Sequence, residues 1–239
     1  MQKIIDQAKE NGKRYETLNN IKIVCKMIFE YAIQNDLVEK DYASFIKLPP
    51  RNERVINRSP FSDEDILTLW NTDKEYIDTI LILIYTGMRI NELLKIKTKD
   101  VHLEKRYIVT GSKTQAGNNR IIPIAKPIEN LIKKHYNINN EYLLLYEGKQ
   151  ISPNIYRTKI WDPLMEKLNM THLPHDCRHT FCSITDRGGM ERLIQQKIIG
   201  HKASNITENI YIHKNLQDLV DAVDKIWPSC VSYVLVTDA

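Results

Sequence analysis

The feature that most constrains this chain is the place where its hydrophobic pattern changes period. Along most of the sequence, apolar residues recur every three or four positions, which is typical of amphipathic helices. Within 101–124 the pattern changes to short runs at 101–103, 107–109 and 120–124, separated by turn residues. We therefore predict a mainly α-helical fold with one small antiparallel β-sheet, an α+β class.

Helices are expected on both sides of this sheet. Ser62 followed by three acidic residues predicts a helix N-terminus, because the hydroxyl can cap the first turn and acids favour its positive dipole end. The predicted ranges are 62–71, 75–86 and 90–96 before the sheet, and 126–135, 152–169, 177–187, 191–199 and 215–226 after it.

The polar, basic stretch at 49–60 predicts a linker between two domains. Before it, Thr17 is the expected N-cap of a helix, and a short helix is expected at 40–46. The apolar face of the longer helix comprises Leu18, Ile21, Val24, Met27, Ile28, Tyr31 and Ala32. Two such helices cannot enclose a core of their own. We therefore expect 1–58 to be part of a larger helical domain that begins before Met1, and 59–239 to be a second domain with a tail at 214–239.

Composition excludes several classes of protein. The chain has 239 residues, 42% hydrophobic and 27% charged, which permits a buried core and argues against disorder. No apolar run approaches the roughly 18 residues of a membrane span, and the N-terminus lacks a secretory signal. The four cysteines form no CxxC pair. We therefore expect a cytoplasmic protein with no membrane partner.

The net charge of +4 is uninformative, but its distribution is not. Segment 89–126 holds nine basic and three acidic residues, 9 − 3 = +6, so the remainder of the chain carries −2. A solvated basic face is the simplest explanation. A helix and sheet with a long polar hairpin also suit a phosphate backbone, which such a patch binds without reading sequence. Lys95, Lys97 and Arg120 are the predicted DNA contacts.

Two short stretches within this segment carry candidate chemistry. In Thr86-Gly87-Met88-Arg89 the glycine is expected to end one helix and the arginine to begin the next, where backbone N–H groups favour anions. Glu92 can reach back to orient Arg89 or to cap the helix. A surface Arg–Glu pair of little energetic value is the alternative. The second stretch places Lys113 on the hairpin, where a lysine is usually solvated.

A third stretch, HDCRHTF, contains His175 and Arg178. They are three residues apart at a predicted helix start and can point the same way. A zinc site made of His172, His175 and His179 is the alternative interpretation. No thiolate pair accompanies these histidines, and a metal site would leave Arg178 unexplained, so we do not expect a metal.

The fourth stretch is Gly200-His201, followed ten residues later by Tyr211. A tyrosine or a lone histidine is most often a core residue. Together with two arginines, however, a histidine can stabilise a pentacoordinate phosphoryl transition state. A tyrosine hydroxyl is a possible nucleophile, and a lysine can protonate a leaving alkoxide. No carboxylate cluster for Mg²⁺ is evident, so no cofactor is expected.

These residues occur in the order found in the tyrosine recombinase (phage integrase) family. The stretches TGMRINELL, HDCRHTF, IGH and TENIYIH resemble that family's conserved boxes, and the resemblance covers about 60–213. Residues 34–50 are similar to the end of the family's helical core-binding domain. Cys177 and Ile199 are small departures, since the family usually has a bulkier aliphatic residue and Leu there. From this resemblance we expect the start of the core-binding domain, and an arm-binding domain before it, to be missing from the sequence.

The resemblance implies a site-specific DNA recombinase, or integrase, in which Tyr211 forms a covalent 3′-phosphotyrosyl link. Arg89, Arg178 and His201 would then stabilise the phosphate charge, Lys113 would protonate the leaving oxygen, and His175 would assist proton transfer. Glu92 would orient Arg89. The covalent link conserves the bond energy, so neither ATP nor a metal is needed.

The resemblance also implies partners and leaves alternatives. We expect double-stranded DNA, a homotetramer on paired sites and a monomer without DNA, with the tail packed either on its own domain or on a neighbouring protomer. A type IB topoisomerase would use the same chemistry to relax supercoils without a partner site. A non-catalytic DNA-binding module would need the basic patch but not the full set of site residues.

Overall fold

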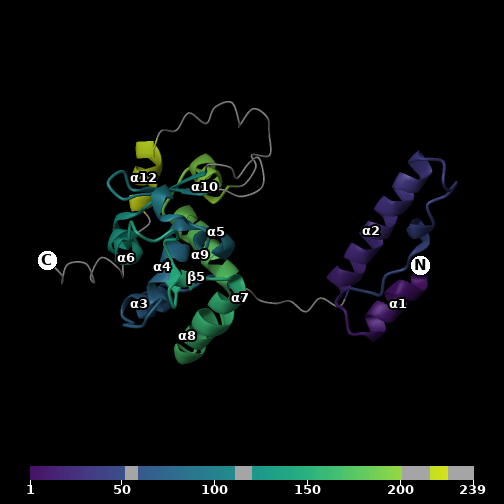
Figure 1. Ribbon diagram of the computed structural model, residues 1–239, viewed down its shortest axis with the longest axis horizontal. Helices are drawn as coiled ribbons and strands as arrows, with labels where there is room; N and C mark the ends of the chain where they lie inside the picture. Colours follow the sequence, from purple (N-terminus) through teal and green to yellow (C-terminus); the bar gives the residue numbers. More distant parts are fainter. Residues whose placement is uncertain (52–58, 111–119, 201–215, 226–239) are drawn as a thin grey trace. The chain divides into compact units, whose positions relative to one another are not determined.

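The computed structural model describes residues 1–51, 59–110, 120–200 and 216–225. The chain divides into two compact units, Met1–Asn57 and Arg58–Ala239, and each is described here by itself (Figure 1). The division falls within the polar stretch at 49–60.

The described residues of the first unit, 1–51, form two α-helices and one 3-10 helix. These are α1 (Gln2–Glu10), α2 (Tyr15–Gln34) and η1 (Tyr42–Phe45), packed around Ile5, Leu18, Cys25, Ala43 and Ile46. The predicted cap at Thr17 is wrong: α2 begins at Tyr15 after Arg14 as N-cap. The short helix expected at 40–46 is the 3-10 helix η1, where the Asp41 carboxylate accepts hydrogen bonds from the Ala43 and Ser44 amides.

The predicted apolar face of α2 is only partly covered. Leu18 is buried, whereas Val24, Met27, Ile28 and Tyr31 are each more than half exposed within the described chain. The spacing of apolar residues therefore predicted the helix correctly, but it did not predict which of those residues are buried.

The second unit is built mainly from helices. The α-helices of its described residues are α3 (Asp63–Trp70), α4 (Ile77–Thr86), α5 (Ile90–Leu93), α6 (Glu129–His135), α7 (Pro153–Ile155), α8 (Asp162–Lys167), α9 (Pro174–Arg187), α10 (Arg192–Ile199) and α12 (Leu216–Asp224). Short 3-10 helices are η2 (Thr98–Asp100) and η3 (Lys126–Ile128), and a π-helical turn, η4 (Tyr156–Trp161), joins α7 to α8. Every residue of α4 is buried, and α9 packs along it (Figure 1).

One three-stranded antiparallel sheet lies between α5 and α6 in the sequence, as predicted. Its strands are β1 (Val101–His102), β2 (Tyr107–Thr110) and β3 (Arg120–Pro123), in the order β1-β2-β3. Thr110 pairs with Arg120, so the strands meet on either side of 111–119. The fold class, mainly α with a small antiparallel sheet, is confirmed.

A second hairpin was not predicted. Strands β4 (Leu145–Tyr146) and β5 (Lys149–Gln150) are joined by Glu147 and Gly148, both with positive φ. Two central residues with positive φ are typical of the tight turns that close two-residue hairpins. The Glu-Gly pair lacks the Asn or Asp that normally signals such a turn.

Helix α9 begins three residues earlier than predicted. Pro174 occupies its first turn, where the missing N–H costs nothing, and the Asp176 carboxylate accepts a hydrogen bond from the Leu173 amide at 2.7 Å. His175 and Arg178 therefore both lie within the first turns of α9. Helix α5, in contrast, ends at Leu93 and does not reach the expected 96.

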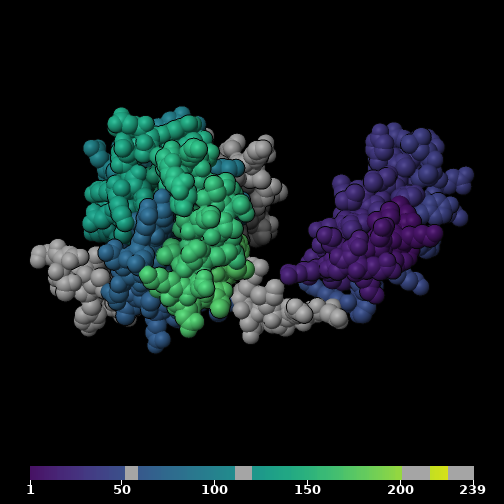
Figure 2. Space-filling view, turned by 60° about the horizontal axis from the view of Figure 1, so that its bottom comes forward, coloured from purple at the N-terminus to yellow at the C-terminus, as the bar shows by residue number. Residues whose placement is uncertain are grey.

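Segments far apart in sequence close the core of the second unit. The Tyr156 hydroxyl is 2.9 Å from the Thr79 hydroxyl, which ties η4 to α4, and the Phe61 amide donates to the Thr180 hydroxyl of α9 at 2.8 Å. In the space-filling view the green surface of 150–187 lies against the blue surface of 60–86 (Figure 2). Within the described chain, no helix is both long and apolar enough to cross a membrane.

Candidate active site

The connection between α4 and α5 holds the first predicted arginine. Gly87 ends α4 in the left-handed region, with φ 61°, and Arg89 is the N-cap of α5. The Glu92 carboxylate accepts the Arg89 amide at 2.8 Å and the Arg89 Nη1 at 3.2 Å. Glu92 therefore both caps the helix and orients the guanidinium. Its side chain is 7% exposed and that of Arg89 is 44% exposed, so Arg89 presents its charge to solvent.

Arg178 is the most unusual group of the site because it is a buried cation. It is 4% exposed, its Nη1 donates to the Gly87 carbonyl at 2.9 Å, and its buried Nη2 has no partner among the described residues. Burial, followed by the charges of Arg89 and Arg120, lowers the pKa of Arg178 to about 10. A buried charge is costly unless it is paired. The arrangement therefore favours an anion beside Arg178.

The structure places Arg120, one of the predicted DNA contacts, in an ion pair inside the domain. Its side chain is 5% exposed, with Nη2 at 2.9 Å and Nη1 at 3.3 Å from the Glu92 carboxylate. Nη1 also donates to the Ile199 carbonyl at 3.1 Å. The Arg120 guanidinium is thus engaged by Glu92 and Ile199 within the domain. The DNA contact proposed for it from the sequence stays a prediction.

A signal for this burial was present in the sequence. Side chains alternate between the two faces of a strand, so Arg120 shares a face with Ile122. Ile122 is fully buried. The alternation of side chains along β3 therefore predicts that Arg120 faces the core, whereas its position beside a basic, polar hairpin favoured a place on the surface.

Of the other two predicted DNA contacts, Lys95 is exposed and Lys97 is partly engaged within the protein. The Lys97 ammonium is 3.0 Å from the Glu141 carboxylate and lies over the Tyr142 ring, 5.9 Å from its centroid. The hydrogen bond to Glu141 raises the pKa of Lys97. The basic segment is thus less available to a polyanion than its formal charge suggests.

The histidines of the third stretch do not form one cluster. His175 is exposed on α9, and its ring meets that of His179 edge-on at a centroid distance of 4.8 Å. His172 stacks on Phe61 at 3.8 Å, with Nε2 3.3 Å from the Asp65 carboxylate. Among the residues the structure describes, no group of His, Cys, Asp or Glu side chains is arranged to hold a metal ion.

Lys113, His201 and Tyr211 lie outside the described residues. The structure thus brings together Arg89, Glu92 and Arg178, and adds Arg120 as an unpredicted member of the same cluster. With three guanidinium groups and one carboxylate, this cluster carries an excess of two positive charges. Such an excess in a largely buried place suits a phosphate diester, whose non-bridging oxygens accept hydrogen bonds from guanidinium groups.

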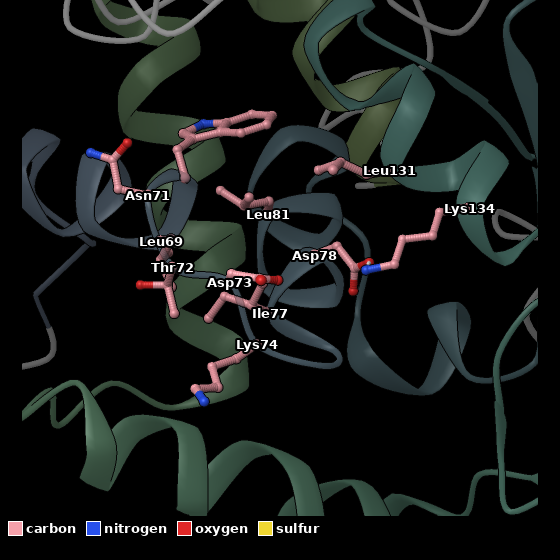
Figure 3. A pocket seen from close by; sticks show the side chains of 11 residues that line it. Leu69, Asn71, Thr72, Asp73, Lys74, Ile77, Asp78, Leu81, Leu131 and Lys134 are labelled. Atoms are coloured by element: carbon pink, nitrogen blue, oxygen red, sulfur yellow. Dashed lines mark ion pairs between the residues drawn. The ribbon is translucent and has the colours of Figure 1, made fainter.

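Two pockets are lined by residues other than those of this cluster. One, of about 270 Å³, is lined by parts of α3, α4 and α6, including Leu69, Trp70 and Leu131 (Figure 3). The Asp78 carboxylate in this pocket is 3.1 Å from the Lys134 ammonium and 2.9 Å from the His135 ring, so its charge is already balanced. The other pocket, of about 550 Å³, lies beside Lys97.

Sequence comparison identifies relatives of the chain. Residues 59–218 match the phage integrase family. The chain is 28% identical over 243 residues to the transposase from transposon Tn916 of Enterococcus faecalis, a match that covers 85% of this chain and 60% of the transposase. It is 27% identical over 232 residues to the tyrosine recombinase XerA of Pyrococcus horikoshii, covering 93% and 78%. The chain thus spans about 60% of the length of the transposase.

Solved structures have the same fold. The Tn1549 transposon integrase in complex with a circular intermediate DNA superposes with a TM-score of 0.71 at 25% identity, over 95% of this chain and 84% of that chain. A lambda integrase tetramer bound to a Holliday junction gives 0.64 at 14% identity, over 84% and 63%, and that likeness concerns the fold alone. Because the family match extends over more than half of its residues, the chain belongs to the phage integrase family, whose members are tyrosine recombinases.

Proposed function

We propose that this chain is a site-specific DNA recombinase that cuts and rejoins strands through a covalent 3′-phosphotyrosyl intermediate. The observation that carries the proposal is the buried Arg178, whose Nη2 has no described partner although Arg89 and Arg120 add positive charge around it. A phosphate diester supplies the missing anion. The relatives support the same function, since they include a transposase, a tyrosine recombinase and an integrase in complex with DNA.

The proposed chemistry is a transesterification, in which the phosphodiester bond to the DNA 5′-oxygen is exchanged for one to a tyrosine oxygen. The Tyr211 hydroxyl oxygen attacks the scissile phosphorus, a Tyr–O–P bond forms, and the bond to the 5′-oxygen breaks. His175 receives the tyrosine proton, and Lys113 gives a proton to the departing 5′-oxygen. Arg89, Arg178 and His201 donate to the non-bridging oxygens as charge develops on them. Attack by a 5′-hydroxyl reverses these steps and reseals a strand.

The proposal includes partners and domain roles. Double-stranded DNA is the substrate, and the active assembly is a homotetramer on two paired sites, with the chain monomeric without DNA. A lambda integrase tetramer bound to a Holliday junction is a precedent for such an assembly. Residues 1–58 would belong to the DNA-binding clamp and 59–239 to the catalytic domain, with the tail at 214–239 available for contacts between protomers. Because its substrate is DNA, we place the protein in the cytoplasm.

A suicide substrate tests the enzymatic part of this proposal. The protein is incubated with nicked duplexes randomised around the nick, so that the short fragment released by cleavage diffuses away and traps the adduct. The expected result is a protein–DNA species that resists denaturant with the native chain and is absent with Tyr211→Phe, while the variant still retards duplex DNA. An adduct that persists with Tyr211→Phe would refute the assignment of the nucleophile. Retardation without any adduct would indicate a DNA-binding module.

A further inference from the structure

Arg120 connects three segments that are distant in sequence. It lies at the start of β3, and its two terminal nitrogens, Nη2 and Nη1, donate to the Glu92 carboxylate of α5 at 2.9 Å and 3.3 Å. Its Nη1 also donates to the carbonyl of Ile199, the last residue of α10, at 3.1 Å. One side chain thus holds the carboxylate that orients Arg89 and the end of the helix that precedes His201 in the sequence.

The chain leaves room for this guanidinium at Gly200. This glycine follows α10 in the left-handed region, with φ 68°. A Cβ at this position would overlap Nη1 of Arg120 and come within 3.0 Å of its Cδ. The absence of a side chain at 200 is therefore what allows the guanidinium to reach the Ile199 carbonyl. Glycine here serves both the backbone conformation and the contact.

The shape of the contact requires arginine. Glu92 receives hydrogen bonds from the Arg89 amide, the Arg89 guanidinium and the Arg120 guanidinium, so both of its oxygens are fixed from two sides. A planar guanidinium can donate to two carboxylate oxygens and a carbonyl at once, whereas a lysine ammonium is a single point donor. Both terminal nitrogens of Arg120 are already engaged by Glu92 and Ile199, whereas Nη2 of Arg178 has no described partner. Arg178 rather than Arg120 is therefore the group left to bind a phosphate.

We infer that Arg120 is a positioning residue for strand cleavage: it locks Glu92 against Arg89 and fixes the end of α10, so that the phosphate-binding groups keep one geometry. The inference rests on the proposed function and deepens it. Displacement of a catalytic group by about 1 Å can reduce a rate about 100-fold. Loss of Arg120 should therefore reduce the cleavage rate without removing a contact to DNA.

The first test separates positioning from phosphate binding. Arg120→Gln and Arg120→Lys are compared with the native chain for duplex affinity over a range of salt concentrations, and for cleavage rate on nicked suicide DNA at saturating protein. We expect both variants to keep the native salt slope, because a lost phosphate contact would reduce it by about 1. We expect cleavage to slow about 10–100-fold with Arg120→Gln, and Arg120→Lys to recover only part of it.

A matched control accounts for general loss of stability. Arg106 is another partly buried arginine, paired with Asp224 of α12 through two hydrogen bonds at 2.9 Å and 2.5 Å. Arg106→Gln should lower the melting temperature yet leave the cleavage rate of the folded protein at its native value. Equal slowing in Arg106→Gln and Arg120→Gln would contradict a specific positioning role, as would a reduced salt slope in Arg120→Gln.

A pH profile supplies a readout that a merely structural residue would not change. Without Arg120, the buried Glu92 loses a cation that favours its ionised form, so its pKa rises. The cleavage rate of Arg120→Gln should therefore fall further at acidic pH than that of the native chain. In the double variant Arg120→Gln, Glu92→Gln this acidic limb should be absent. Parallel profiles for the native chain and Arg120→Gln would overturn the inference.

Hydrogen exchange measures the coupling without catalysis, so the inference and the proposed function can fail separately. Arg120→Gln should speed exchange at the amides of α5 and at the end of α10 while leaving α4 protected. Unchanged exchange at both places would refute the positioning role even if the native chain cleaves DNA. Absence of an adduct with the native chain would refute the proposed function, while the exchange result would still decide whether Arg120 holds the two segments together.

Discussion

The buried Arg178 is the residue on which the functional account depends most. Its Nη1 is held by the Gly87 carbonyl, while its Nη2 is buried without a described partner. Nearby Arg89 and Arg120 contribute to lowering its pKa, so an anion in this place relieves both desolvation and repulsion.

Inorganic phosphate should stabilise the native chain through Arg178, because a ligand that binds only the folded state raises its stability. We expect the melting temperature to rise with phosphate at constant ionic strength, and the rise to be smaller in Arg178→Gln. Arg187→Gln is the control, since Arg187 is an exposed arginine on the same helix, paired with Asp63. Equal rises in all three proteins would show that the anion acts through the solvent and not at the site.

Glu92 should make stability depend on pH in a defined direction. Burial opposes its ionisation, but the charge of Arg120 and the Arg89 amide lower its pKa below 4.5. A carboxyl group whose pKa is lower in the folded chain than in the unfolded chain stabilises the fold at pH values above the unfolded pKa. This stabilisation disappears as the pH falls through the folded pKa.

Glu92→Gln should therefore reduce the free energy of unfolding by about 3 kcal/mol at pH 7, since it breaks a buried ion pair. Its deficit relative to the native chain should shrink at pH values below 4.5. Urea unfolding of both proteins at neutral and acidic pH measures this, and a deficit independent of pH would contradict it.

Among the helices and strands, the sequence predicted correctly some of the boundaries that depend on neighbouring residues, such as helix caps. Ser62 is the N-cap of α3 as expected, where it also forms a capping box with Asp65, and Gly87 ends α4. The predicted cap at Thr17 is wrong because α2 begins at Tyr15, three residues earlier than a Thr17 cap implies, and its N-cap Arg14 makes no side-chain capping hydrogen bond. The β4–β5 hairpin and the π-helical turn η4 were missed because neither carries a distinctive local pattern.

Gly87 should be irreplaceable at the junction of α4 and α5. Its φ is 61°, and a Cβ there would lie 2.7 Å from the Phe181 ring of α9. Gly87→Ala should therefore cost about 1–2 kcal/mol for the backbone and a further 1–3 kcal/mol for crowding the core. Gly148→Ala is the matched control, because Gly148 has φ 74° and nothing within 4 Å of its Cβ position. Denaturant unfolding that shows equal losses in the two variants would contradict the packing argument.

For the molecule as a whole, the sequence pattern predicted the family and the fold correctly, but it did not predict how the side chains of the site contact one another. The separate stretches gave Arg89, Glu92 and Arg178, and the fold brings these three together. The sequence could not predict that Arg120 contacts Ile199, because that contact joins residues 79 positions apart and depends on how α10 packs on β3. The charge sum of 89–126 was likewise a poor guide, since Arg120 and Lys97 have carboxylate partners within the fold.

The proposed function requires Tyr211 to become covalently linked to DNA in a site organised by Arg89 and Arg178. The most direct measurement is mass spectrometry of the adduct trapped on nicked suicide DNA, after digestion of both protein and DNA. We expect one modified peptide, carrying a nucleotide through a phosphodiester on Tyr211, and we expect it to be lost in Arg178→Gln. A nucleotide on any other residue, or no modified peptide from a chain that binds the same DNA, would contradict it.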